Sequence, residues 1–439
     1  MRRAMIRLML YVVIMLVPVG VASLLGDGSV NPVHEAGKCA ALIAFVIVFL
    51  QVLLVARIKW IEQAFGFDMV IRFHRNMALL AAVLLLSHPL LIAASEGDWK
   101  LLVGLDLPWY IWLGKIALVI LVANILLGIY QKRLNLKFEQ WRTGHNIAGL
   151  LIITLVFVHS WLAGDDLEPT AMKVLWSALL AMAVLLYLYH KIFGPLRRKN
   201  DAYVVMAVHQ ETADVWTIKM SPPAGVKIPP YLPGQFHFLT FYRNRQLPVE
   251  EHHWTISSSP AETGYVSSTI KELGDFTATI GDTRVGDKVA VQGAFGRFSY
   301  ILHPDETDLV FIAGGIGITP LMSMLRHMRD TADNRSVVLL YANPEADKIV
   351  FRQELADLEN SLYPRLTVAH VLERPSGDRT VESGYIDREK IERNCTGDLR
   401  KKAFYVCGPK QMRDAVIRDL KDLGVADGRI RMEIFSFLD

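Results

Sequence analysis

The sequence of 439 residues contains few cysteines and shows no marked excess of charge of either sign. Its three cysteines, Cys39, Cys395 and Cys407, are scattered and follow neither a metal-ligand spacing nor a disulfide framework. The formal net charge of +3 gives no reason to expect a nucleic-acid partner. Long apolar runs are nearly absent from residues 200–439. A disulfide-stabilised fold and a nucleic-acid-binding function are therefore not expected.

The apolar residues are concentrated in the first half of the chain. Hydrophobic residues make up 52% of the sequence, and the mean hydropathy of +0.28 is high for a soluble protein. A transmembrane helix needs about 20 mostly apolar residues to cross roughly 30 Å of hydrocarbon. The sequence therefore predicts a six-helix transmembrane bundle within residues 1–195. The six expected spans are 6–25, 36–57, 73–95, 109–130, 145–163 and 171–193.

The distribution of lysine and arginine predicts the orientation of these helices, because cytosolic loops carry an excess of both. We expect both termini to be cytosolic and the protein to lie in the plasma (inner) membrane. The expected outer side keeps only a few lysines, and one of its loops is acidic, with Asp165, Asp166 and Glu168. A cleaved signal peptide at residues 2–22 is the alternative reading of the first span. The expected cytosolic basic residues are Arg2, Arg3, Arg7, Arg57, Lys59, Arg72, Arg75, Lys132, Arg133, Lys137, Arg142, Lys191, Arg197, Arg198 and Lys199.

Four histidines lie inside two of the expected helices. His74 and His88 belong to the third helix, and His145 and His159 to the fifth; each pair is 14 positions apart. Fourteen residues are close to four helical turns, so each pair lies on one helix face about 21 Å apart. Both helices run in the same direction across the membrane. We therefore expect His74 to face His145 near the cytosolic side, and His88 to face His159 near the outer side.

Two facing imidazoles can supply both axial ligands of a heme iron. Interhelical hydrogen bonding is the plainer role for a membrane histidine, but two equal spacings with one common offset argue against it. The four histidines therefore predict two b-type hemes stacked across the membrane. Arg75 and Arg142 lie at the cytosolic helix ends, where they either pair with heme propionates or only follow the positive-inside rule. His34 and His190, at other helix ends, are interpreted as snorkelling side chains.

The second half of the chain has the pattern of two further domains. Residues 200–303 contain short alternating strands with Gly/Pro turns, which indicate an antiparallel β-barrel. Residues 304–439 alternate strands with helices, including an expected helix over 349–359, and indicate an α/β parallel-sheet domain. We expect a multidomain protein with these three parts.

Two glycine-containing turns follow strands of the expected α/β domain. One reads Gly314-Gly315-Ile316-Gly317-Ile318-Thr319-Pro320, and the other contains Cys407, Gly408 and Pro409. Glycines let a backbone approach a pyrophosphate, and the following helix N-terminus favours its negative charge. Both turns are expected at the carboxyl edge of one sheet, where ligands bind in this architecture.

Taken together, these segments resemble the flavin and nicotinamide modules of ferredoxin-reductase type. Joined to a six-helix domain with paired histidines, they resemble the ferric reductase and NADPH oxidase superfamily over roughly residues 36–439. The family's flavin motif His-Pro-Phe-Thr is matched by His252-His253-Trp254-Thr255, with Pro and Phe replaced. The resemblance implies FAD and NAD(P)H as cofactors, with Thr255 at the isoalloxazine and His252 at the FAD phosphates.

The resemblance also implies roles for the remaining motif residues. Lys271, Gly274 and Thr277 match the turn against the FAD pyrophosphate, and Cys407 matches the cysteine beside the hydride-donating carbon. Phe435, or Phe437 as second choice, matches the terminal aromatic that covers the flavin, although core packing is the alternative. The segment after the second strand of the α/β domain has no arginine that could hold a ribose phosphate. A preference for NADPH over NADH therefore rests on the family resemblance alone. The residues matching the dinucleotide-binding motifs are Gly314, Gly315, Gly317, Thr319, Pro320, Cys407, Gly408 and Pro409.

The implied activity is transfer of electrons from cytosolic NAD(P)H through FAD and the hemes to an acceptor outside. The acidic outer loop favours ferric iron as this acceptor. Reduction of oxygen to superoxide is the first alternative, and relay to a protein partner the second.

Overall fold

The computed structural model describes residues 2–25, 31–374 and 381–435. These residues fold into two compact units, Met1–Gly194 and Pro195–Asp439.

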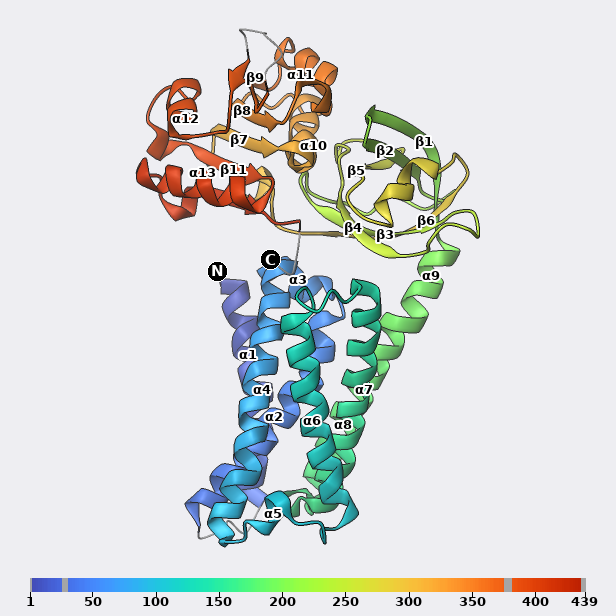
Figure 1. Cartoon of the computed structure of the whole chain (residues 1–439), viewed down its shortest axis with the longest axis vertical. Coiled ribbons are helices and arrows are strands. Elements are labelled where there is room, and N and C mark those ends of the chain that lie inside the picture. Colours follow the sequence, from blue (N-terminus) through green and yellow to red (C-terminus); the bar gives the residue numbers. More distant parts are fainter. Residues whose placement is uncertain (1, 26–30, 375–380, 436–439) are drawn as a thin grey trace. The chain divides into compact units, whose positions relative to one another are not determined.

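The first unit is a bundle of long helices that run alongside one another (Figure 1). Within the described residues, six helices are long and apolar enough to cross a membrane, which confirms the predicted number. The third and fifth long helices begin earlier than expected, because hydropathy detects only their apolar part. Each begins with an ion pair near its first turn, Asp68 with Arg72 and Glu139 with Arg142, both at 2.6 Å. The helices are α1 (Arg2–Leu25), α2 (Pro32–Val55), α3 (Lys59–Phe65), α4 (Phe67–Glu96), α5 (Lys100–Val103), α6 (Trp109–Tyr130), α7 (Phe138–Ala163) and α8 (Thr170–Leu188).

Helix α2 supplies the largest share of the core of this bundle. Phe45 and Phe49 are buried, and the Phe45 ring stacks on Trp176 of α8 with centroids 4.2 Å apart. Helix α1 joins the same core through Tyr11, whose ring meets Phe73 edge-on. Many apolar side chains of the other helices are exposed. An apolar outer surface on helices whose backbone groups are internally bonded suits a lipid environment.

The second unit begins with a six-stranded antiparallel sheet in the order β4-β3-β6-β1-β2-β5. Just beyond the edge strand β4, the amide of Ser257 donates to the carbonyl of Ser267 on the other edge strand, at 2.8 Å. This contact curls the sheet towards a barrel around an apolar core. The strands are β1 (Tyr203–Thr212), β2 (Val215–Ser221), β3 (Phe236–Tyr242), β4 (Glu251–Thr255), β5 (Val266–Lys271) and β6 (Lys288–Phe295).

A six-stranded parallel sheet follows, in the order β10-β9-β8-β7-β11-β12. Its strands alternate buried side chains between two cores, one beneath α10 and α11 and the other beneath α12 and α13. The antiparallel and parallel sheets confirm the predicted fold class. The elements are β7 (Asp308–Gly314), β8 (Ser336–Asn343), β9 (Arg365–Leu372), β10 (Glu382–Ser383), β11 (Ala403–Cys407), β12 (Ile430–Glu433), α10 (Ile318–Asp330), α11 (Arg352–Glu359), α12 (Arg388–Asn394) and α13 (Lys410–Asp422).

The expected helix over 349–359 is too long at its start. Phe351 has a φ of 61° in the left-handed region, so the helical hydrogen bonding begins only at Arg352. A residue in this conformation cannot continue a right-handed helix.

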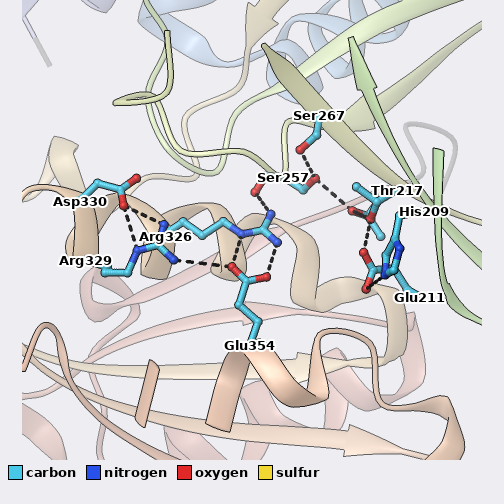
Figure 2. Close-up of polar contacts among 10 residues, drawn as sticks. His209, Glu211, Thr217, Ser257, Ser267, Arg326, Arg329, Asp330 and Glu354 are labelled. Carbon is cyan, nitrogen blue, oxygen red and sulfur yellow. Dashed lines mark hydrogen bonds and ion pairs between the residues drawn. The ribbon is translucent and has the colours of Figure 1, made fainter. Parts of the chain in front are cut away.

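Within the second unit, Arg326 of α10 ties the two sheets together (Figure 2). Its guanidinium forms a bidentate pair with Glu354 of α11 at 2.6 and 2.8 Å. It also donates to the backbone carbonyl of Ser257, at the end of the antiparallel sheet. From Ser257 a chain of buried hydroxyls continues to Thr269 and Thr217, each step 2.8–3.0 Å. The fork of the guanidinium therefore fixes the parallel-sheet part of this unit against the antiparallel-sheet part.

Candidate functional site

The parallel sheet has a topological switch point between β7 and β11. From β7 the chain proceeds through β8 and β9 to one edge, whereas β11 and β12 lie on the other side. Ala313 pairs with Cys407 at the carboxyl ends of these two strands. The two predicted dinucleotide turns therefore lie next to each other, in the crevice where ligands bind in open α/β sheets.

Three glycines allow the two turns to interlock. A Cβ atom on Gly317 would lie 2.3 Å from the Cys407 carbonyl oxygen, and one on Gly314 would lie 2.6 Å from the sulfur of Met412. A Cβ on Gly408 would lie 3.0 Å from the amide nitrogen of Gly314. Glycine is required here because the two backbones approach more closely than any side chain permits.

The Cys407 side chain is fully buried at the end of β11. Burial raises the pKa of this thiol well above its ordinary value, so it is neutral near pH 7. Thr319 and Pro320 lie in the first turn of α10, where the Thr319 hydroxyl donates to the Ile316 carbonyl at 3.1 Å. Gly315 has a φ of 52° and bends the chain into this turn.

A cavity of about 200 Å³ gathers most of the predicted flavin residues. It is bounded by β4, the end of β5, the start of α10 and the segment after β12. The lining includes His252, His253, Trp254, Thr255, Lys271, Thr277, Thr319 and Phe435. Gly274 does not line it, and Phe437 lies outside the described residues.

The two adjacent histidines of β4 make different contacts. His252 lies 2.8 Å from a carboxylate oxygen of Glu250, and its ring is 4.5 Å from that of Phe276. The Nε2 atom of His253 lies 2.8 Å from the backbone carbonyl of Phe435, a contact in which the imidazole donates. This bond joins the end of the chain to β4 beside the cavity.

The turn after β5 is organised by a hydroxyl. The Thr277 oxygen accepts from the backbone amides of Leu273 and Gly274 at 2.8 and 2.9 Å. Lys271, at the end of β5, lies 3.6 Å from a carboxylate oxygen of Asp214. Partial burial opposes ionisation of Asp214, but the hydrogen bond from Lys348 and the charge of Lys271 hold its pKa below the ordinary value.

His237 is a buried residue behind this cavity that the sequence reasoning missed. Its Nε2 atom lies 2.6 Å from the hydroxyl of Ser268, which donates to the Thr255 carbonyl at 3.1 Å. Burial lowers the pKa of His237 to about 3, so the ring is neutral near pH 7. Only the alternation of β3, which puts His237 on the same face as the core residues Leu239 and Phe241, hinted at an inward imidazole.

In the first unit, the four membrane histidines form two facing pairs between α4 and α7. His74 and His145 line one cavity of about 130 Å³, with ring centroids 6.1 Å apart. His88 and His159 line another, of about 320 Å³. The pairs expected from the sequence are therefore the pairs that meet.

Each of these histidines has a partner for its Nδ1 atom. His88 and His159 contact the backbone carbonyls of Gly37 and Tyr110 at 2.9 and 2.8 Å. A carbonyl oxygen only accepts, so Nδ1 carries the proton and Nε2 keeps its lone pair. His145 contacts the side-chain oxygen of Asn124 at 3.0 Å, which is also an acceptor. Metal-binding histidines are typically oriented in this way. At His74 the nitrogen of the Gln51 side-chain amide donates to Nδ1 instead.

The donor set suits a heme better than a bare metal ion. Among the residues that the structure describes, no group of three or more His, Cys, Asp or Glu side chains could hold a metal. Bis-histidine heme needs only two imidazoles, with the porphyrin supplying the other four nitrogens. A Cβ on Gly114 would lie 2.9 Å from three atoms of the His159 ring. This glycine lets the imidazole pack flat against α6.

The charged residues at these cavities differ from those expected. Arg75 and Arg142 line neither cavity. His190 and Lys191 line the His74/His145 cavity, although the sequence offered only snorkelling for His190. His34, Lys38, Lys115, Glu96, Asp165 and Asp166 line the His88/His159 cavity.

Two family models match the chain. Residues 40–156 match "Ferric reductase like transmembrane component", and residues 311–418 match "Oxidoreductase NAD-binding domain". The first match covers both histidine pairs except His159, and the second covers both dinucleotide turns.

Similar proteins match about half of the chain. A flavohemoprotein of Oceanobacillus iheyensis is 26% identical over 55% of this chain and 60% of its own length. The reductase component of a propane 2-monooxygenase of Rhodococcus jostii is 29% identical over 53% and 62%, respectively. The chain thus spans less than two thirds of these relatives.

Solved structures show weaker likeness. The FAD/NAD-binding domain of a nitric oxide dioxygenase from Vibrio cholerae has a TM-score of 0.46 at 22% identity, over 53% of this chain and 97% of its own. A flavohemoglobin from Malassezia yamatoensis has a TM-score of 0.49 at 16% identity, over 92% and 98%. Both scores are below 0.5, so these likenesses add nothing to the assignment.

The chain therefore joins a part similar to a ferric-reductase-like transmembrane component, whose described helices are long and apolar enough to cross a membrane, to a part similar to an oxidoreductase NAD-binding domain.

Proposed function

We propose that the chain carries electrons from cytosolic NAD(P)H, by way of FAD and two b-type hemes, to ferric iron on the outer side of the plasma (inner) membrane. The observation that carries this proposal is the pair of facing histidine sets in α4 and α7, in which His88, His145 and His159 each have an oxygen acceptor at Nδ1. Bound flavin would convert a two-electron hydride into single electrons, and bound hemes would pass single electrons.

In the second unit, the residues around the 200 Å³ cavity would bind and orient the flavin. Thr255 would contact the isoalloxazine, His252, Lys271 and Thr277 would hold the phosphates, and Phe435 would cover the ring. Support for the phosphate role comes from Lys271, a basic residue that lines the cavity, and from the adjoining turn that Thr277 organises.

The crevice between β7 and β11 would bind the nicotinamide dinucleotide. Gly314, Gly315 and Gly317 would admit the pyrophosphate, and the N-terminus of α10 would favour its charge. Cys407 would position the nicotinamide as a neutral, buried thiol rather than act as a nucleophile, because burial keeps its proton in place.

In the first unit, His74 with His145 and His88 with His159 would each hold one heme iron. The basic residues at the ends of the expected spans support cytosolic termini, by the positive-inside rule. The His74/His145 pair would then lie nearer the cytosol.

The identity of the acceptor rests on the charges around the His88/His159 cavity. Its carboxylates, Glu96, Asp165 and Asp166, favour a cationic acceptor such as ferric iron. Lys38 lies 2.7 Å from Asp166, so part of its charge is compensated. Lys115 also lines the cavity and makes reduction of oxygen to superoxide the second candidate.

Cytochrome c reduction by the purified protein, with and without superoxide dismutase, tests the acceptor. If ferric iron is the acceptor, NAD(P)H oxidation accelerates with a soluble ferric chelate and superoxide dismutase has little effect on cytochrome c reduction. Strong inhibition by superoxide dismutase, with no stimulation by the chelate, would overturn the ferric proposal in favour of oxygen. A protein with no dithionite-reducible b-type spectrum would overturn the whole electron path.

A further inference from the structure

The end of the last long helix contains a change of helical pitch. Residues Tyr189–Phe193 form a π-helical turn, closed by the Gly194 amide donating to the Tyr189 carbonyl. Pro195 follows and has no amide hydrogen to offer the Lys191 carbonyl, so an α-helical turn would lose a bond there. π-helical turns are rare and are frequent at functional sites.

This turn belongs to the wall of the His74/His145 cavity. The residues of this helix that line the cavity are Ala183, Val184, Tyr187, His190 and Lys191. Their spacing of three and four positions puts them on one helix face. The π-helical turn thus carries an imidazole and an ammonium group to the same cavity as the histidine pair.

The composition of this cavity wall indicates what it would bind. Besides the histidines, its polar side chains are Gln51, Asn124, Asn146, Tyr187 and Lys191; the rest are apolar. All of its lining residues are described by the structure, and none is an aspartate or glutamate. An apolar wall with two facing imidazoles and a cation at one end matches a flat apolar metal chelate that carries carboxylates.

We propose that Lys191 and His190, on this π-helical turn, form the binding site for the carboxylate groups of the tetrapyrrole held between His74 and His145. The proposal rests on the proposed function, since it requires a heme in this cavity. Lys191 is a strongly hydrated point charge on a flexible stem, suited to a carboxylate at the edge of a cavity. It replaces Arg75 and Arg142, which line neither cavity, as the partner of the propionates.

A cation beside the heme carboxylates should stabilise the reduced, less positive form of the iron. Removing the cation should therefore lower the midpoint potential of this heme and leave the other unchanged. We expect a fall of about tenfold in the reduced-to-oxidised ratio at fixed solution potential, which is about 59 mV for a one-electron couple.

The test is potentiometric titration of the b-type absorbance, with a heme assay, on the full-length holoprotein. The variants are Lys191→Gln, Lys191→Arg and Lys173→Gln, the last a lysine of the same helix that lines neither cavity. Lys191→Gln should lower one of the two redox components, or lose one heme; Lys191→Arg should restore it, and Lys173→Gln should match the wild type.

Two results would overturn the proposal, and they are distinguishable. If the wild type binds two hemes and Lys191→Gln leaves both components and the heme content unchanged, the carboxylate site is wrong while the proposed function stands. If the wild type binds no heme, the proposed function fails and the carboxylate site fails with it.

Discussion

The two histidine cavities of the membrane unit are built from the same helices but hold their imidazoles differently. At the His74/His145 cavity, the partner that orients His145 is a side chain, the amide oxygen of Asn124. At the His88/His159 cavity, both histidines are oriented by backbone carbonyls, those of Gly37 and Tyr110.

The charged residues that line the two cavities also differ. One cavity has Lys191 and no carboxylate among its lining residues, whereas the other has three carboxylates beside its lysines. A partner made of side chains can be changed by a single substitution, and a backbone partner cannot. The orientation of the histidines at the His74/His145 cavity can therefore be changed by single substitutions. At the His88/His159 cavity it depends on helix positions and on glycines that let the rings approach.

Replacing a member of each histidine pair should have the largest effect and tests whether the two cavities are equivalent. His145→Ala and His159→Ala should each lose one of two hemes. NAD(P)H-driven ferric reduction should fall at least about 100-fold, more than the loss typical of an orienting partner. Heme content and steady-state reduction measure this, with ferricyanide reduction by the flavin module as the control that should persist. Retention of both hemes in either variant would contradict the pairing.

His237 offers a contrast with the membrane histidines, because it is buried against a hydroxyl and lines none of the three cavities described. Its folded-state pKa is about 3 and its ordinary value 6.5, so unfolding takes up a proton between these pH values. Stability of the flavin and nicotinamide module should therefore be full above pH 6.5 and fall as the pH drops towards 3, by a few kcal/mol.

Denaturant titrations of the full-length protein across this pH range, followed by flavin release, measure the effect. The pH dependence should flatten in His237→Gln. It should persist in His209→Gln, a control at a histidine whose side chain is 70% exposed. An unchanged slope in His237→Gln would rule out this residue as the cause.

Substituting Gly114 should affect only the His88/His159 cavity, whose histidines are oriented by backbone carbonyls. In Gly114→Ala the new methyl group would collide with the His159 ring, at 2.9 Å. We expect a cost of about 1–3 kcal/mol, seen as weaker heme retention at that site. Gly128→Ala, on the same helix, is the control, since its methyl group meets Trp141 at an ordinary 3.7 Å. Equal heme retention in the two variants would show that the close approach has no role.

Removing the side chain of Asn124, which orients His145, should have the smallest effect. It directly compares a side-chain partner with a backbone partner. Asn124→Leu should weaken heme binding at the His74/His145 cavity about tenfold, the lower end for such partners. Tyr110→Phe should leave the other heme unchanged, because the carbonyl that orients His159 is retained. Titration of the apoprotein with hemin measures both. A loss of affinity in Tyr110→Phe equal to that in Asn124→Leu would remove the distinction.

Much of the architecture could be predicted from local pattern. Six apolar runs long enough to cross a bilayer and the alternation of strands and helices each follow from short segments, and the structure confirms them. The start of α11 could not be predicted, because the left-handed Phe351 ends a pattern that is otherwise helical. The starts of α4 and α7 could not be predicted from hydropathy, because the segments before their apolar parts contain charged residues that form ion pairs.

For the candidate sites, the spacing of the four histidines in the sequence predicts which of them meet. Spacing along a helix fixes both the face and the depth of a side chain. The partners that orient those histidines, and the charges that surround them, depend on how the helices pack in the tertiary structure. The carbonyls of Gly37 and Tyr110 have no signature in the sequence, because every residue has one. Lys191 reaches the His74/His145 cavity wall through the packing of a third helix, which periodicity along α4 and α7 cannot reveal.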